Sequence, residues 1–508
     1  MSSITNRTYR LLLSTPNLSR GVGIYALCAV GTALACAITL LPGAHQPEVN
    51  VPPATPGTTA PAVSMPLALR KTSHGVTFSG EITNPKIVQG DSGRVYLNFA
   101  VATPELSSAE GVRKPTDMLV ILDKSGSMSA ENRLPYAKSA IIDLLGRLNE
   151  QDRFALVTFD SGASTLSPFV EISATQRERL SSLVSTIQPG SGTNMSGGIN
   201  LAESLLRTLD GSRSRRVILL SDGEANEGIT SSEALGQLSR DLNRRDAVVS
   251  TIGMGLGFNE RVMSLVADQG GGNFSYLESL ATLGTILNKD LLDARQVFAS
   301  SSEIRLQLPR GARLVDAGGY PIEGGQEDSG AVTIRTGQLL SGKDKRFFVT
   351  LDVPTSETGS LDLGKPELRL VANTIPIQLN LGEQPLKVAV VQQSERVQAN
   401  AALNQDLWRD AWSSNNYGVM QRELQSFIRS GDRVKADQTV ARYQEEITKA
   451  EAASGVSLRT PELLKNLHQL AEENSDSFSG STNEQELKRN RYGKKLWGSG
   501  ASYQRGSY

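Results

Sequence analysis

Asp123, Ser125 and Ser127 stand at alternate positions in the segment DKSGSM, directly after the apolar run MLVIL. A carboxylate and hydroxyls at this spacing can ligate a hard cation, because Mg²⁺ prefers oxygen ligands and alternate side chains can share one side of a loop. Gly126 lets the backbone turn tightly between the two serines. Taken alone, the same residues could equally form a turn followed by a helix N-cap.

Two more oxygen-bearing segments follow. GSGTNMSGG offers Thr193 before a predicted helix, and VILLSDGEAN offers Asp222 after an apolar strand. In isolation the first is a glycine-rich loop and the second an ordinary turn. Open α/β sheets bind ligands beyond the carboxyl ends of their strands, so we expect the three segments to meet there. The predicted metal site consists of Asp123, Ser125, Ser127, Thr193 and Asp222.

Two carboxylates would neutralise a divalent cation, and the three hydroxyls would complete the protein's share of the coordination. Mg²⁺ favours six oxygen ligands and commonly keeps water, which leaves a position for an outside carboxylate. The sequence does not choose among Mg²⁺, Mn²⁺ and Ca²⁺.

Four other polar residues lie near these segments. Asp117 precedes the first strand, at the opposite edge, and is predicted to be solvated or to cap a turn. Asp160 follows the run RFALVTF and is expected to serve a turn, with support of the metal ligands as the alternative. Glu224 and Asn226 follow Asp222 closely and could shape the rim that faces a ligand.

Apolar runs alternate with helical stretches from about 117 to 297. A helix predicted to begin at Arg133 places an apolar face at 3.6-residue spacing. Its members are Leu134, Ala137, Ile141, Leu144, Leu145 and Leu148. Continuously apolar strands that alternate with helices favour a mainly parallel sheet with helices on both faces.

The segments DKSGSM, GSGTNMSGG and LLSDGEANEGIT resemble the metal-ion-dependent adhesion site of von Willebrand factor type A (VWA) domains. The segment STIGMGLGFNERVMSLVADQGGGNFSYLES resembles the bacterial, membrane-anchored branch, which is similar to chloride-channel accessory proteins and inter-alpha-inhibitor heavy chains. The resemblance is strong over about 115–297 and weak outside it, and we expect the VWA domain to span 115–299. It implies a Rossmann-like fold, metal-assisted protein binding, and the same five ligands, without a departure in residue type.

Short β-rich runs flank this domain. Residues 71–114 and 300–392 are predicted to pair in one β-sandwich, into which the α/β domain is inserted. Residues 393–475 are predicted to form two or three packed helices. The basic tail, 476–508, is predicted to be disordered. Its tyrosines and Trp497 could touch an anionic polymer, lipid or nucleic acid, although a solvated tail is the simpler interpretation.

The N-terminal part has three expected segments. Residues 1–20 carry arginines without acids and are predicted to be cytoplasmic, and 21–42 form an apolar membrane anchor. Residues 43–70 form a Pro-rich linker. A cleaved signal peptide, or lipidation at Cys36, is the alternative. Both cysteines, Cys28 and Cys36, fall in the apolar segment, so we expect no disulfide beyond it.

Enzyme classes find little support. The three histidines, His45, His74 and His468, all lie outside the α/β domain, and no P-loop or G-x-S-x-G segment occurs. GMGLGF is only a partial match to a dinucleotide loop, and the predicted oxygen ligands have no evident base beside them for a metal hydrolase. A net charge of −1 gives no reason to expect nucleic-acid binding.

The sequence therefore predicts a non-enzymatic, membrane-tethered protein with most of its chain outside the cytoplasm, in the periplasm or at the cell surface of a bacterial envelope. A partner protein would offer a carboxylate to the metal. The alternative is a scaffold of an envelope complex, in which the metal only stabilises loops.

Overall fold

The computed structural model describes residues 68–105, 115–210, 213–277, 279–324, 330–372, 375–382 and 385–504. The predicted cytoplasmic segment 1–20, the predicted anchor 21–42 and nearly all of the linker 43–70 lie outside these residues. No helix within the described ranges combines the length and apolar character needed to cross a membrane.

A six-stranded sheet forms the centre of the α/β domain, in the order β10-β9-β8-β5-β6-β7. All neighbouring strands are parallel except β7, which pairs antiparallel with β6. The sheet residues of β5, β8 and β9 are all buried, as strands covered on both faces must be. The strands are β5 (Thr116–Asp123), β6 (Arg153–Phe159), β7 (Ala163–Glu171), β8 (Ser214–Ser221), β9 (Ala247–Met254) and β10 (Gly271–Leu277).

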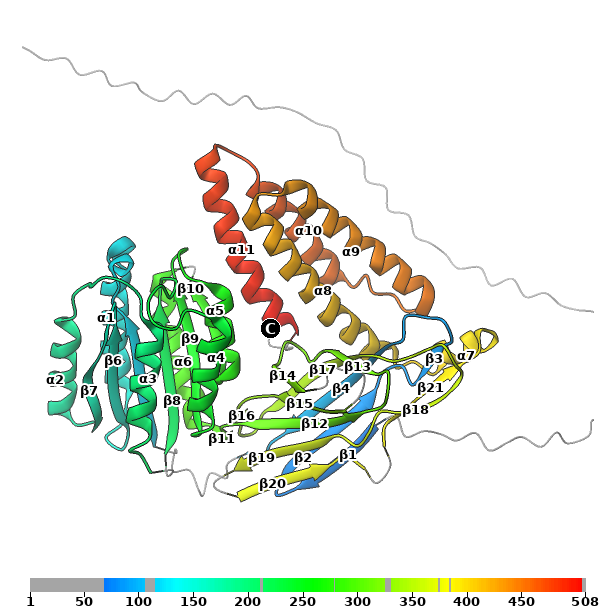
Figure 1. The fold of residues 1–508 in the computed structure, drawn as a ribbon, viewed down its shortest axis with the longest axis horizontal. Helices are drawn as coiled ribbons and strands as arrows, with labels where there is room; N and C mark the ends of the chain where they lie inside the picture. Colours follow the sequence, from blue (N-terminus) through cyan, green and yellow to red (C-terminus); the bar gives the residue numbers. More distant parts are fainter. Residues whose placement is uncertain are drawn as a thin grey trace, which may run out of the picture. The chain divides into compact units, whose positions relative to one another are not determined.

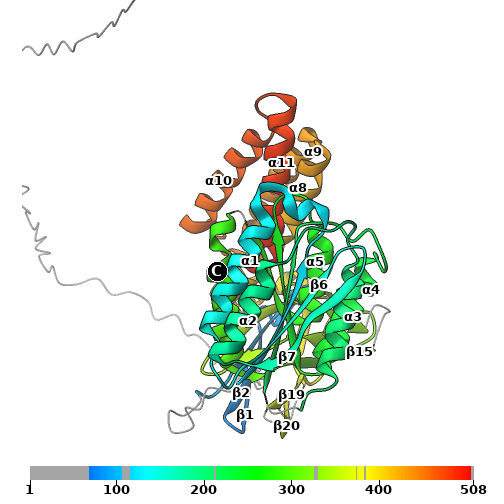
Figure 2. The same ribbon diagram turned by 90° about the vertical axis from the view of Figure 1, so that its left-hand side faces the viewer.

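Helices cover both faces of this sheet. One apolar cluster contains side chains from α1 (Arg133–Arg147), α2 (Ala174–Ser185) and α6 (Leu283–Arg295). The other contains side chains from α3 (Met195–Leu206), α4 (Ser232–Asn243) and α5 (Glu260–Gln269). Figure 2 shows α1 and α2 on one side of the sheet and α3 and α4 on the other. Short 3₁₀ helices, η2 (Gly126–Asn132) and η3 (Leu280–Thr282), precede α1 and α6.

The chain enters and leaves this domain at one point. Asp152 is buried, and its carboxylate accepts a hydrogen bond from the backbone N–H of Thr116, at the start of β5 (2.8 Å). Its other oxygen accepts one from Arg295, at the end of α6 (3.0 Å). One carboxylate therefore ties the two ends of the insert together, at the edge opposite to the strand carboxyl ends.

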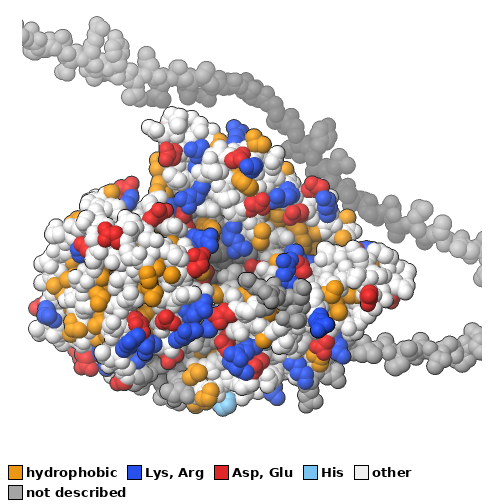
Figure 3. All heavy atoms as spheres, in the orientation of Figure 1, with side chains coloured by type: hydrophobic (Ala, Val, Ile, Leu, Met, Phe, Trp, Pro, Cys, Tyr) orange, Lys and Arg blue, Asp and Glu red, His pale blue; other side chains and the backbone are white. Residues whose placement is uncertain are grey.

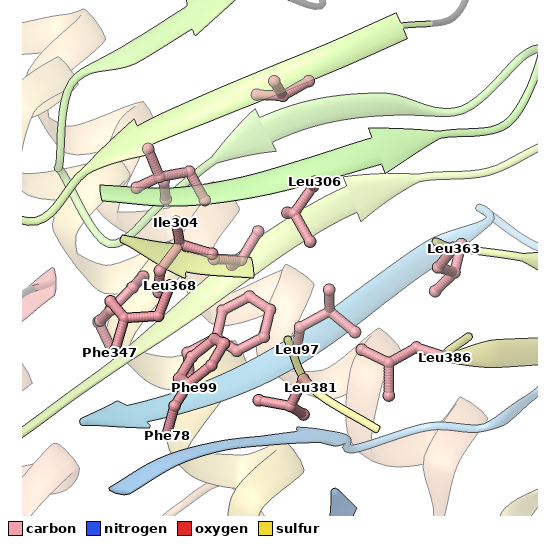
Figure 4. Packing of buried hydrophobic residues seen from close by; sticks show 14 of the residues in the cluster. Phe78, Leu97, Phe99, Ile304, Leu306, Phe347, Leu363, Leu368, Leu381 and Leu386 are labelled. Atoms are coloured by element: carbon pink, nitrogen blue, oxygen red, sulfur yellow. The ribbon is translucent and has the colours of Figure 1, made fainter. Parts of the chain in front are cut away.

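The β-rich regions before and after the insert share sheets. β4 pairs antiparallel with β17 over nine residues, from Arg94–Asp352 to Ala102–Asp344. Five strands form the sheet β1-β2-β4-β17-β13, and five more form β14-β15-β12-β19-β20. Smaller sheets are β18-β21-β3 and β11-β16. Phe78, Phe99 and Phe347 pack at ring-centroid distances of 5.6 and 6.1 Å in the core of this region (Figure 4).

Before the insert, the strands in chain order are β1 (Ala68–Ser73), β2 (Val76–Ile82), β3 (Lys86–Val88) and β4 (Arg94–Ala102). After it they are β11 (Val297–Ala299), β12 (Ser302–Leu308), β13 (Arg313–Asp316), β14 (Ile322–Gly324), β15 (Gly330–Arg335), β16 (Leu339–Leu340), β17 (Asp344–Asp352), β18 (Gly359–Asp362), β19 (Glu367–Ala372), β20 (Ile375–Asn380) and β21 (Lys387–Val391). The predicted fold class, an α/β domain flanked by β-rich regions and followed by helices, is confirmed.

The C-terminal region is helical to residue 504 (Figure 1). After η4 (Gln393–Glu395) it comprises α7 (Arg396–Ala401), α8 (Gln405–Ser430), α9 (Arg433–Ser454), α10 (Pro461–Ser477) and α11 (Thr482–Gln504). The prediction of disorder over 476–508 is wrong for α11, which packs mainly along α8. The tail is polar in composition, but Tyr492, Lys494 and Leu496 of α11 are buried, and their burial holds the helix in place.

Charges are mixed over the surface. On the face drawn in Figure 3, Lys and Arg side chains are interspersed with Asp and Glu side chains. The surface on this face agrees with the small net charge of the sequence.

Candidate metal centre

Asp123 ends β5 and is fully buried. Its Oδ1 accepts a hydrogen bond from the backbone N–H of Ser125 (2.8 Å), and its Oδ2 accepts one from the Ser221 hydroxyl (2.6 Å). Burial raises the pKa of Asp123 from 3.8 to about 6, and the nearby Asp222 carboxylate also raises it, against these hydrogen bonds. Among the described residues, Asp123 makes no ion pair with a basic side chain, so a cation would relieve the cost of its buried charge.

The two serines of the first loop face each other. Ser125 Oγ lies 3.0 Å from Ser127 Oγ, and Ser127 Oγ donates to Asp222 Oδ1 (2.8 Å). Ser125 stands at the N-cap position of η2, but its side chain makes no capping hydrogen bond. The helix-cap interpretation therefore does not account for the Ser125 hydroxyl. Ser125 is buried, whereas Ser127 is exposed, so the loop has a side open to solvent.

Asp222 and Thr193 reach the same place from distant parts of the chain. Asp222 follows β8 directly, and Thr193 lies in the loop before α3. A Cβ added to Gly223 would lie 3.5 Å from Thr193 Oγ1 and 3.6 Å from Ser127 Oγ. Both hydroxyls thus border one small space beside Gly223. The structure brings all five predicted ligand residues together at the carboxyl-end edge of the sheet.

Arg133, the first residue of α1, was not predicted as part of this centre. Its Nη1 donates to Asp222 Oδ2 (2.7 Å), and its Nη2 donates to Glu131 (2.8 Å). Glu131 and Asn132 have positive φ values of 52° and 58°, which bend the chain sharply between the serine loop and α1. Arg133 orients one carboxylate of the centre, and no spacing rule in the sequence reveals this.

Backbone hydrogen bonds fix the loops around the centre. Lys124 N–H donates to the Phe159 carbonyl (2.8 Å), and Gly190 N–H donates to the Lys124 carbonyl (2.6 Å). The side chain of Lys124 pairs with Asp160. Burial raises the pKa of Asp160, but the Lys124 ion pair and the Gly162 N–H outweigh it and leave that pKa below its ordinary value. Asp160 thus supports the first loop through Lys124.

Asn226 performs a similar task for the second loop. Its side-chain oxygen accepts from the Thr193 backbone N–H (2.8 Å), and its own N–H donates to the Thr193 carbonyl (3.1 Å). Glu224 is exposed beside it. Of the two residues predicted to shape the rim, Asn226 holds Thr193 and Glu224 is exposed to solvent.

Asp117 departs from its prediction. It is fully buried at the start of β5, and its carboxylate accepts two hydrogen bonds from Arg153, at 2.7 and 2.8 Å. It is a paired structural residue rather than a solvated or capping one, because the parallel neighbour β6 places a basic side chain beside it.

The donor set fits a hard divalent cation. Two buried carboxylates and three hydroxyls converge, and one carboxylate has a pKa raised by burial. No group of three or more His, Cys, Asp or Glu side chains that could hold a metal ion occurs in the part of the chain that the structure describes.

The profile of the von Willebrand factor type A domain matches residues 118–224, which contain all five predicted ligands. The chain is 28% identical to the Escherichia coli protein YfbK over 195 residues, 38% of this chain and 33% of YfbK. It is 27% identical to calcium-activated chloride channel regulator 1 of Macaca mulatta over 237 residues, 46% of this chain and 23% of that protein.

A solved von Willebrand factor type A structure from Catenulispora acidiphila has a similar fold. It covers 79% of this chain and 91% of its own, with a TM-score of 0.60 and 17% identity. The chain therefore contains a VWA domain, a module that serves protein–protein interaction and adhesion and commonly holds a divalent cation. It spans only a third or less of the length of YfbK and of the chloride channel regulator.

Proposed function

We propose that this chain is a non-enzymatic adhesion protein that binds a partner protein through a divalent cation held at the VWA domain. The observation that carries the proposal is the meeting of Asp123 and Asp222, both fully buried, with three hydroxyls at one sheet edge. Ligands of open α/β sheets bind at this edge.

The chain's own residues divide the work. Asp123, Ser125, Ser127, Thr193 and Asp222 would hold the cation. Ser221 and Arg133 orient the two carboxylates by hydrogen bonds of 2.6 and 2.7 Å. Asp160, through Lys124, and Asn226 keep the loops in place. A bound Mg²⁺, Mn²⁺ or Ca²⁺ would supply positive charge and a free coordination position, and the exposed side at Ser127 would admit a carboxylate of the partner.

The loops are already fixed by direct hydrogen bonds between protein groups, which favours a ligand-binding role for the metal over a loop-stabilising one. We also propose that the apolar segment 21–42, which lies outside the described residues, anchors the chain in the membrane of a bacterial envelope. Most of the chain would then lie outside the cytoplasm.

The test is capture of partners from membranes by the purified protein in Mg²⁺ and in EDTA. Wild type is expected to capture partners in Mg²⁺ but not in EDTA. Asp123→Ala is expected to capture them in neither condition. Asp143→Ala serves as a matched control, since it removes an exposed carboxylate of α1 that pairs with Arg147 on its own helix. Capture of the same partners by Asp123→Ala, or in EDTA, would refute metal-dependent binding and favour the scaffold alternative.

A further inference from the structure

A buried lysine of the C-terminal helix α11 contacts the VWA domain. Lys494 is 2% exposed, and its Nζ donates to the Phe258 carbonyl and to Glu260 Oε1, each at 2.8 Å. The same Nζ lies 3.7 Å from the centre of the Phe258 ring. A buried ammonium group with one ion pair, one carbonyl and one aromatic face is fully engaged, so its position is tightly defined.

Glu260 is also buried, and a second basic side chain pairs with it. Arg429 of α8 donates to Glu260 Oε2 at 2.9 Å. Two helices of the C-terminal region therefore converge on the first residue of α5. Phe258 also packs against Phe274 and Tyr276 of β10, at ring-centroid distances of 6.0 and 5.7 Å. The loop before α5 is clamped between the helical region and the sheet.

This loop, 255–259, also borders the metal centre. A Cβ added to Gly257 would lie 3.1 Å from the Asp222 carbonyl, and one added to Gly255 would lie 2.5 Å from the Arg133 guanidinium carbon. Gly255 has φ of 74°, so both space and backbone conformation require glycine there. A shift of the loop would therefore displace Asp222 or the arginine that orients its carboxylate.

We propose that Lys494 is a positioning residue for the metal centre. By fixing Phe258 and Glu260, it holds the loop 255–259 against Asp222 and Arg133, and α11 thereby completes a site whose ligands all belong to the VWA domain. The inference depends on the proposed function, because it concerns affinity for the same cation. Breaking this contact weakens cation binding roughly 2- to 30-fold, the range for residues coupled to a site through packed neighbours.

The test measures Mg²⁺ affinity of the full-length chain by calorimetry for Lys494→Met, which keeps an unbranched side chain one atom shorter and removes its charge. The control is Lys495→Met, the next residue on α11, whose ammonium pairs with partly exposed Glu473 instead of the VWA domain. Lys494→Met is expected to lose affinity within the stated range and Lys495→Met to match wild type. Equal affinity of Lys494→Met and wild type, within twofold, would overturn the proposal.

Hydrogen exchange separates positioning from a general loss of stability. Lys494→Met is expected to speed exchange in the loop 255–259 and leave the amides of β5 unchanged, whereas equal acceleration in β5 would contradict a positioning role. If Lys494→Met does not fold, Glu260→Gln replaces it and must show the same weaker Mg²⁺ binding. A wild-type chain without Mg²⁺ affinity would instead refute the proposed function itself. Wild-type binding that Asp123→Ala abolishes and Lys494→Met leaves intact would refute this inference alone.

Discussion

Replacing Asp123 by Asn is expected to stabilise the metal-free VWA domain at neutral pH. Burial raises the pKa of Asp123 to about 6, so its charge is costly when no cation is bound. An Asn side chain has nearly the same shape. Its oxygen can accept from the Ser125 N–H and its amide group can donate to the Ser221 hydroxyl, so the substitution removes the charge and keeps both hydrogen bonds.

The size of the effect follows from linkage. Because the folded-state pKa lies above the unfolded value, the favourable contribution is present below pH 3.8 and is lost as the pH rises through about 6. At about 1.36 kcal/mol per pH unit, the rise in pKa corresponds to about 3 kcal/mol. In the absence of metal, the free energy of unfolding of Asp123→Asn should exceed that of wild type by up to about this amount at pH 7. At pH 4 the difference should be less than about 1 kcal/mol.

The assay must report on the VWA domain. All three tryptophans, Trp408, Trp412 and Trp497, lie in α8 and α11, so their fluorescence follows the helical region. Hydrogen exchange of β5 and β8 amides in EDTA, compared between Asp123→Asn and wild type from pH 4 to 8, measures the required difference. A variant that is less stable than wild type at pH 7, or a difference that does not vary with pH, would refute the reasoning.

Two further predictions concern the cation. Wild-type affinity for Mg²⁺ should fall about tenfold for each pH unit below about 6, because a proton and the cation compete for Asp123. Calorimetry from pH 5 to 8 in buffers of different ionisation enthalpy measures both the affinity and the proton release. An affinity that does not vary with pH would count against this carboxylate as a ligand. Thr193→Val keeps the shape of the side chain and removes its hydroxyl, so it should weaken Mg²⁺ binding on the order of tenfold without changing exchange in β5; unchanged affinity would exclude Thr193 from the centre.

Sequence reasoning reached the VWA fold and the grouping of five ligand residues, because the motif residues follow strand ends and parallel strands end at one edge. It missed β7, whose side chains are mostly exposed or half-buried and lack a continuous apolar run. It also missed Arg133 and Ser221, since their roles depend on the direction of single hydrogen bonds.

The disorder prediction for the tail failed for a related reason. Composition averages over a segment, but α11 is held by the burial of three side chains and by specific ion pairs. The contact between Lys494 and Glu260 joins residues that lie far apart in the chain. The sequence around either residue does not predict the other as its partner. Similarly, the buried pairing of Asp117 with Arg153 depends on the register of β5 and β6.

The attachment of both ends of the VWA domain at Asp152 has a mechanical consequence. A partner held at the metal edge would pull on the carboxyl ends of β5 and β8, along the strands and away from the two covalent links beside Asp152. Tension in this direction loads the hydrogen bonds of β5 with β6 and β8 in shear, so many must yield together. Both links would share the load, and β5, which is paired on both sides, could not be peeled away alone. With the proposed partner bound, this attachment would let the domain bear traction.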